Sequence, residues 1–432
     1  MDFLSQHAIT PTGHYMILLE FLAVLVYSIH LPYVGIVIGS VALSSWLTFR
    51  DREVPNSHFN RFAGDLIDVF LGNRYAMFVL GVFPLFALPF IYSQWFVGLE
   101  ATTLRYIPLV IPAVAVGFVT VAMYASSYAD RRRRYGRHML MGLMGVGILK
   151  VSYFVLLASV VRLNDPEKWF RIKNIWIMLL NWNVIWKFAF FMHAAIAITG
   201  AAILFFFFGW RREQMQRDPN YALFVRRFGG GLALGFTMAL PVFYLFYIFT
   251  TPDVAFNNTV YVLASAVGLV SMIIALFLVG TLSATRPRFG GIVFSLLLTV
   301  FVLAGSVDLI AMNRANWEHY RLIEQAAEEK KAARSAEMHA LLEGGPGPDA
   351  GERIFQSICS ACHRMDVKLV GPALDDVLSG YQSVEALASF IANPTRKNPD
   401  YPPMPSPGLS SADAKAVAGY LLGASVESGG GH

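Results

Sequence analysis

The chain has 432 residues, of which 56% are hydrophobic and 14% aromatic, while only 15% are charged. This composition is too apolar for an ordinary soluble enzyme, so we expect the chain to lie in a membrane, surrounded by lipid. The formal net charge of +5 is small for this length. Because the basic residues gather between apolar stretches, no nucleic acid partner is expected.

Eight apolar stretches are each long enough to cross a bilayer, which takes about 20 residues. They lie near 15–48, 75–97, 107–128, 138–161, 186–210, 229–250, 259–283 and 289–312. The first stretch lacks a basic flank and is too long for a cleavable signal peptide, so we expect it to be retained as a helix. The predicted fold class is all-α: a polytopic transmembrane helix bundle followed by a small all-α domain.

Arginine clusters mark alternate ends of these stretches. They follow the first, third, fifth and seventh stretches, whereas the N-terminus and the segments near Glu100 and 251–258 hold almost no basic residue, and the segment at 162–173 is mixed. An excess of basic residues on cytoplasmic loops places both termini outside the cytoplasm. We therefore expect a multi-pass protein of the bacterial inner membrane with its C-terminal part on the periplasmic side.

Composition also divides the chain into four parts. Residues 1–312 form the predicted membrane bundle, and 313–349 form a charged, helix-prone spacer that breaks at a glycine- and proline-rich hinge, "GGPGPDAG". Residues 350–425 have the composition of a small soluble domain, and 426–432 are expected to be a disordered tail.

The small domain carries the motif "CSACH". A C-x-x-C-H sequence is the signature of covalent haem c attachment, in which Cys359 and Cys362 form thioethers and His363 is the proximal ligand. The alternatives are a redox dithiol or half of a zinc site. The flanking sequence is similar to small cytochromes c, and it places Met404 in a proline-rich loop as the expected distal ligand. Met365 is the poorer alternative.

Two histidines lie at the same predicted depth in the membrane. His30 precedes Arg50 by 20 residues and His193 precedes Arg211 by 18, which places both in the outer leaflet, about 27–30 Å from the cytoplasmic face. Imidazoles inside a membrane are rare and tend to be functional. We expect them to bind one or two haems b. The neighbouring small residues would let a flat macrocycle approach the backbone: Gly35, Gly39, Ala194, Ala195 and Gly200.

The ligand pairing stays open from the residues alone. His30 and His193 ligate one haem together, or each ligates its own haem with a second ligand such as Met238 or Met272. The remaining alternative is that both imidazoles are hydrogen-bonded between helices. Lys150, inside the fourth stretch, is a candidate to neutralise a haem propionate or to line a proton or quinone path.

Two segments resemble the large subunit of bd-type quinol oxidases. "YSIHLPYVGIVIGSVALSSWL" with "HFNRFAGDLIDVF" is similar to that family's first helix, and "LLNWNVIWKFAFFMHAAIAITGAAILFF" to its fifth. The resemblance implies haem ligation by His30 and His193, and it makes Met272 a loose counterpart of a methionine ligand. The chain lacks the family's "GRQPW" segment and the carboxylates of its third helix, so the resemblance implies haem b binding rather than quinol oxidation or oxygen reduction.

The sequence therefore predicts a membrane-bound b/c-type cytochrome. It is expected to relay electrons between haem b in the outer leaflet and a periplasmic haem c, with companion subunits and a periplasmic donor or acceptor protein, and with quinone as an open question. Three alternatives remain: a bd-like terminal oxidase fed through cytochrome c, a membrane urate-oxidising cytochrome c fusion, and a membrane anchor whose cytochrome c docks a partner.

Overall fold

The computed structural model describes residues 13–53, 57–96, 101–283, 290–322, 324–326, 328–329, 332–333, 350–399 and 401–429. These fall into two compact units, Met1–Glu324 and Gln325–His432, and each is described by itself. No strand occurs in the described ranges, so the all-α fold class is confirmed. The described residues of the spacer up to 333 are almost all helical, whereas the predicted hinge lies outside the described residues.

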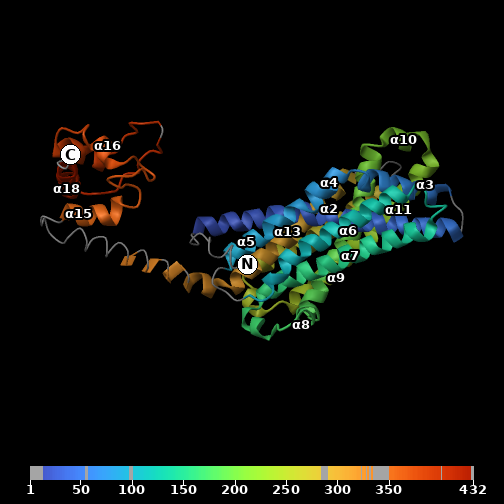
Figure 1. Cartoon of the computed structure of the whole chain (residues 1–432). Coiled ribbons are helices and arrows are strands. Elements are labelled where there is room, and N and C mark those ends of the chain that lie inside the picture. Colours follow the sequence, from blue (N-terminus) through green and yellow to red (C-terminus); the bar gives the residue numbers. More distant parts are fainter. Residues whose placement is uncertain are drawn as a thin grey trace. The chain divides into compact units, whose positions relative to one another are not determined.

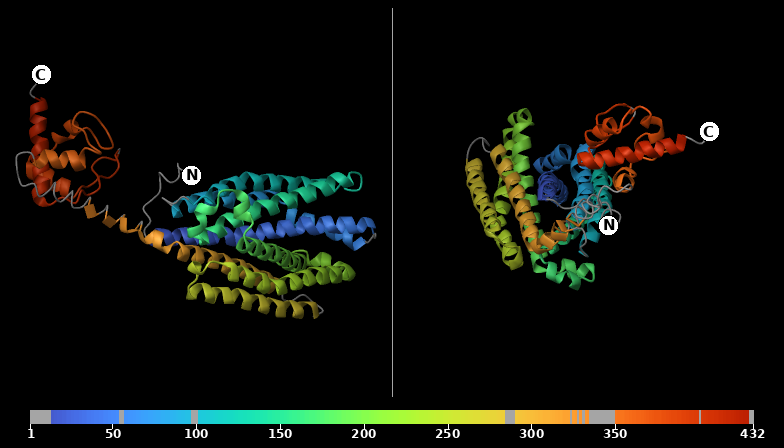
Figure 2. Two further views of the ribbon diagram at one scale, coloured as in Figure 1. Left: turned by 90° about the horizontal axis from the view of Figure 1, so that it is seen from below. Right: turned by 90° about the vertical axis from the view of Figure 1, so that its left-hand side faces the viewer.

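The first unit contains eight helices that are long and apolar enough to cross a membrane, as the sequence predicted. The long helices run side by side (Figures 1 and 2). The second span is broken into three pieces by a 3-10 turn, Phe83–Phe86, that contains Pro84. In chain order the spans contain α2 (Gly13–Glu53), α4 (Arg74–Gly81) with η2 (Phe83–Phe86) and α5 (Ala87–Trp95), η3 (Leu104–Tyr106) with α6 (Ile107–Ser127), α7 (Tyr135–Val161), α9 (Trp182–Gly209), α11 (Pro219–Thr250), α12 (Asn258–Ser283) and α13 (Gly290–Ala315).

One boundary differs clearly from the expectation. The sixth span was expected from 229, but α11 begins ten residues earlier, at Pro219. Asp218 caps this helix by accepting a hydrogen bond from the backbone N–H of Tyr221, and proline suits the first helical position, where an N–H would have no partner. Arg226 and Arg227 therefore lie inside α11 rather than in a loop.

Helix α9 is the central helix of the bundle, and small residues bring its neighbours close to it. In the most apolar 18-residue stretch of α9, 72% is buried, whereas in the corresponding stretch of α12 only 22% is buried. A Cβ added to Gly35 of α2 would lie 3.0 Å from Cα of Ala195, and one added to Gly39 would lie 2.1 Å from Oγ1 of Thr199. Gly200 similarly packs against the backbone of Ala233 in α11. These close approaches are typical of helix packing in membranes.

This packing corrects one expectation from the sequence. The small residues beside the two histidines were expected to leave room for a macrocycle. Instead, the structure fills the space at Gly35, Gly39 and Gly200 with side chains and backbone of neighbouring helices. The glycines set the distance between helices, and they leave no room for a macrocycle at those positions.

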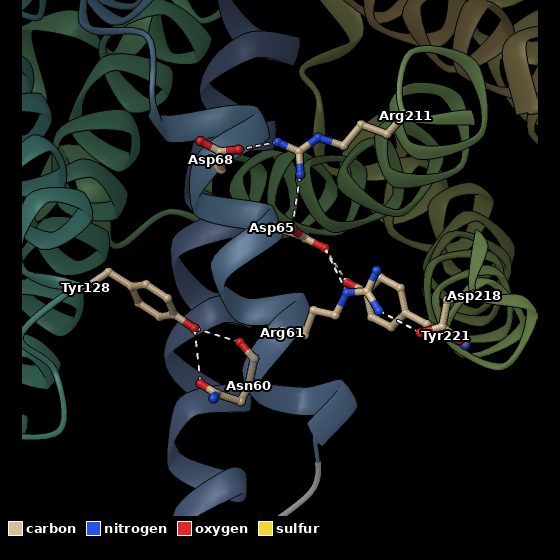
Figure 3. Close-up of polar contacts among 8 residues, drawn as sticks. All are labelled: Asn60, Arg61, Asp65, Asp68, Tyr128, Arg211, Asp218 and Tyr221. Carbon is tan, nitrogen blue, oxygen red and sulfur yellow. Dashed lines mark hydrogen bonds and ion pairs between the residues drawn. The ribbon is translucent and has the colours of Figure 1, made fainter. Parts of the chain in front are cut away.

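The arginine-bearing ends of the helices are joined by a polar network (Figure 3). Asp65 of α3 (Ser57–Leu66) accepts hydrogen bonds from Arg211 at 3.0 Å and from the Tyr221 hydroxyl at 2.6 Å. Arg61, on the same helix, pairs with Asp218 at 2.7 Å. The network thus links the segment after α2 to the end of α9 and the start of α11.

The end of α6 joins this network. The hydroxyl of Tyr128 donates a hydrogen bond to the backbone carbonyl of Asn60 at 2.7 Å, and Arg131 bonds the Asn60 side chain. The arginine clusters that follow the first, third and fifth spans therefore gather at one end of the bundle, which agrees with the predicted alternation. Their location on the cytoplasmic side stays a prediction.

The second unit is built on a close crossing of its first and last helices. Its helices are α15 (Ala350–Ile354), the π turn η7 (Phe355–Cys359), α16 (Leu374–Leu378), α17 (Val384–Ala392) and α18 (Ser411–Gly429). A Cβ on Gly351 would lie 2.1 Å from the Ala416 carbonyl oxygen, so only glycine fits where α15 meets α18. Helix α18 continues to Gly429, four residues into the predicted tail, and 430–432 lie outside the described residues.

Candidate functional site

The predicted haem c residues line one cavity in the second unit. The turn η7 ends at Cys359, whose carbonyl oxygen accepts hydrogen bonds from the N–H groups of Cys362 at 3.1 Å and His363 at 2.9 Å. Both cysteines, His363 and Met404 line a cavity of about 470 Å³, within the size range of ligand pockets. The fold therefore brings Met404 to the motif, although about 40 residues separate them in the chain.

The His363 ring has a backbone partner at one of its two nitrogens. Its Nδ1–H donates to the carbonyl oxygen of Pro372 at 3.5 Å. A Cβ on Gly371 would lie 2.2 Å from Cε1 of the ring, so the imidazole occupies the space that a side chain would need there. A backbone partner on one ring nitrogen fixes the orientation of a metal-ligating histidine. The lone pair of Nε2 is then available as an iron ligand.

Met404 is placed to supply the second ligand. It is half-buried and lines the cavity between Pro403 and Pro405, whose fixed backbone angles stiffen the loop. Met365 packs against the hydrophobic core of the unit and does not line the cavity. Of the two methionines that the sequence left open, the structure thus favours Met404.

The cysteines suit an attachment site better than a redox dithiol. Burial, with a smaller contribution from Cys362, raises the pKa of the Cys359 thiol, whereas reactive C-x-x-C motifs lower the pKa of one thiol. No group of three or more His, Cys, Asp or Glu residues that could hold a metal ion occurs among the described residues. The zinc alternative therefore gains no support from them.

The remaining cavity wall is mostly apolar, and its exposed rim carries two cations and one carboxylate. Phe355, Leu378 and Leu421 are among the apolar wall residues, and Arg396, Lys397 and Asp376 line the rim. The Lys397 ammonium donates to the Tyr381 hydroxyl at 3.1 Å. Such a wall and rim fit a flat apolar macrocycle that carries carboxylates at one edge, so the residues present fit haem c.

In the membrane unit, both ring nitrogens of His30 already have partners. The ring is fully buried. Nδ1–H donates to the carbonyl oxygen of Leu80 at 2.8 Å, and Nε2 accepts from the Tyr153 hydroxyl at 2.5 Å. This is the hydrogen-bonded arrangement that the sequence left open as an alternative to haem binding. Iron ligation by His30 would have to displace the tyrosine, and it stays a prediction.

His193 has a different environment. Its Nδ1–H donates to the carbonyl oxygen of Ala189 on the same helix at 2.8 Å. The ring lies against Phe243 of α11, with centroids 3.9 Å apart, and near Phe236. Among the described residues no hydrogen bond reaches Nε2, and the residue is half-buried. His193 therefore presents one free ring nitrogen, whereas His30 does not.

The predicted common depth of the two histidines agrees with helix register. Gly35 packs against Ala195, and Gly39 against Thr199, so α2 and α9 run parallel in register. His30 lies five residues before Gly35 and His193 two residues before Ala195, a difference of about 4.5 Å along the axis. The rings nevertheless contact different helices, His30 contacting α4 and α7 and His193 contacting α11, so the structure does not join them at one site.

The other predicted membrane ligands lie on the surface of the bundle. Met272 of α12 is 65% exposed and Met238 of α11 is 64% exposed, so neither is turned into the interior beside a histidine. Lys150 of α7 is also exposed. The structure therefore gives no support to Met272 as an iron ligand or to Lys150 as a partner of a haem propionate.

A buried charge pair escaped the sequence reasoning. Lys187 of α9 pairs with Asp308 of α13 at 2.5 Å, and the Tyr247 hydroxyl of α11 donates to the same carboxylate at 2.8 Å. The Asn183 side chain donates to the Tyr247 carbonyl oxygen at 3.0 Å. The signal was present, because Lys187 and Asp308 are charges inside apolar stretches. The cluster fixes α9, which carries His193, against α11 and α13.

Comparison with known proteins identifies the second unit alone. A family model described as cytochrome c matches residues 348–425. Cytochrome c-552 of Nitrosomonas europaea is 32% identical over 88 residues, which are 19% of this chain and 85% of that protein. Cytochrome c-551 of Pseudomonas denitrificans is 35% identical over 17% of this chain and 94% of that protein, and cytochrome c-551 of Stutzerimonas stutzeri 38% over 17% and 74%. No solved structure matches significantly.

Proposed function

Because residues 348–425 belong to the cytochrome c family, we propose that the protein is a membrane-bound b/c-type cytochrome. It relays electrons between a haem b in the outer leaflet of the bundle and a haem c in the second unit. One observation carries the proposal: Cys359, Cys362, His363 and Met404 line a single cavity. A haem bound there supplies reversible one-electron exchange.

The residues around this cavity have separate tasks. The two cysteines would anchor the macrocycle, and His363, with Pro372 at Nδ1 and Gly371 against its ring, would offer Nε2 to the iron. Met404 supplies a thioether, which raises the reduction potential. The apolar wall excludes water from the macrocycle, and this also favours the less charged, reduced state.

In the bundle we assign haem b ligation to His193. Its support is the tautomer fixed by Ala189, the absence of a described hydrogen bond at Nε2, and the aromatic neighbours Phe236 and Phe243. His30 then has the role of a hydrogen-bonded core residue that joins α2 to α4 and α7. The proposed setting is the bacterial inner membrane, with the haem c unit on the periplasmic side beside a donor or acceptor protein and with companion subunits.

Pyridine haemochrome spectra of the purified full-length protein test the proposal. Wild type is expected to contain both b and c haem, and His193→Ala to lose the b bands while keeping haem c. His30→Ala is the matched control and is expected to keep haem b. Haem c alone in wild type would refute the relay and leave a membrane-anchored cytochrome c. A high-spin haem that binds carbon monoxide would instead favour a terminal oxidase.

A further inference from the structure

Helix α7 carries a lysine on its exposed side, near the middle of its span. Lys150 follows Arg137 by 13 residues and precedes Arg162 by 12. At 1.5 Å per residue these separations are about 20 and 18 Å, and the hydrocarbon core of a bilayer is about 30 Å thick. The lysine therefore leaves the helix close to the middle of the apolar layer.

The surrounding face of α7 is open and otherwise apolar. Leu143 lies four residues before Gly147 and Val151 four residues after it, so both are neighbours of Gly147 on the helix surface. Leu143 is 73% exposed and Val151 is 64% exposed. A Cβ added to Gly147 would meet nothing within 4 Å. The described part of the chain thus leaves this face uncovered, and the glycine leaves space where another helix can come close.

The described spans hold no spare carboxylate for this lysine. Its eight spans contain three acidic residues: Glu20, Asp51 and Asp308. Glu20 is bonded by Asn313, and Asp308 by Lys187 and Tyr247. Asp51 lies in the last turn of α2, at the arginine-bearing end of the bundle. A second copy of the chain would therefore bring another lysine to this face and no free acid.

Lys187 is an intramembrane lysine whose partners lie within the chain, and it serves as a comparison for Lys150. Its ammonium is buried, paired with Asp308 at 2.5 Å, and placed over the Tyr247 ring at 4.5 Å. Lys150 has none of these contacts among the described residues. Since an uncompensated ammonium at this depth is costly, the difference indicates a partner that comes from outside the chain.

We propose that the face of α7 around Lys150, Gly147, Leu143 and Val151 binds a membrane-spanning helix of a companion subunit. That helix is apolar and carries an aspartate or glutamate near the middle of the bilayer, which forms an ion pair with Lys150. The inference does not depend on haem b, because it uses only the surface of α7 and the charges of the spans.

Carbodiimide coupling tests the inference in native membranes that contain the full-length chain. A membrane-permeant carbodiimide activates a carboxylic acid, Lys150 Nζ attacks the activated carbon, an amide forms and the urea leaves. Peptide mass spectrometry is expected to find Lys150 joined to an acidic residue within an apolar segment of another protein. Lys150→Met is expected to abolish this conjugate, while conjugates through Lys415 of the second unit persist.

The assembly itself gives a second measurement. On native electrophoresis in mild detergent, the complex of the Lys150→Met variant is expected to be smaller by the mass of the companion subunit. The complex of Lys150→Arg is expected to keep its size, because the positive charge is kept. Unchanged haem c absorbance in both variants shows that they have folded. Unmodified Lys150 in membranes where Lys415 reacts would overturn the inference, and so would coupling to a second copy of this chain or to a segment outside the membrane.

Discussion

Replacing Gly371 with alanine is expected to destabilise the second unit and to tilt the His363 ring. The new Cβ would lie 2.2 Å from Cε1 and 2.7 Å from Nδ1 of the ring, whereas favourable carbon contacts lie at about 3.5–4.0 Å. The ring cannot retreat without losing its bond to Pro372. Overpacking of this kind costs about 1–3 kcal/mol, and each kcal/mol lowers the melting temperature of a domain of this size by roughly 4–8 °C.

Circular dichroism of the haem c Soret band during heating measures this effect in the full-length protein. Gly419→Ala is the matched control, because a Cβ there meets nothing within 4 Å and the residue lies inside α18. Only Gly371→Ala should also shift the haem c midpoint potential, since it alone moves an iron ligand. If both variants melt alike and keep the wild-type potential, the glycine does not position the ring.

Two further outcomes follow from the contacts described above. Met404→Ala should lower the haem c midpoint potential, because a methionine ligand raises it, and Met365→Ala should leave it unchanged; equal shifts in a redox titration would show that Met404 is not the ligand. Asp308→Asn should cost about 3–5 kcal/mol by leaving Lys187 buried without its counter-ion, and Lys187→Met together with Asp308→Leu should recover much of the loss. Thermal unfolding in detergent measures both variants, and no destabilisation in Asp308→Asn would show that the pair is not formed.

The spans and the haem c motif were predictable because their signals are local. A span is encoded by about 20 consecutive apolar residues, and all eight were found. The C-x-x-C-H motif likewise holds three site residues within five positions. The similar level of His30 and His193 along their helices was also predictable, since counting residues from Arg50 and Arg211 needs only the helical rise, and the register of Gly35 against Ala195 agrees with it. Their depth in the bilayer stays a prediction.

The orientation of side chains around each helix was not predictable. A membrane helix that is apolar on all sides carries no amphipathic pattern to show which face is buried. The sequence therefore could not separate Lys187, which is buried against Asp308, from Lys150, which is exposed. It also could not show that Tyr153 and Leu80 meet His30, because these partners come from other helices.

A rapid-mixing measurement of electron entry tests the proposed relay most directly. The oxidised full-length protein is mixed, without oxygen, with a hydrophilic reductant that stays outside the apolar layer, and the b and c absorption bands are followed separately. The relay predicts that haem c is reduced first and haem b second, and that Cys359→Ala with Cys362→Ala slows haem b reduction greatly. Haem b reduction at the wild-type rate in that double variant would contradict the relay.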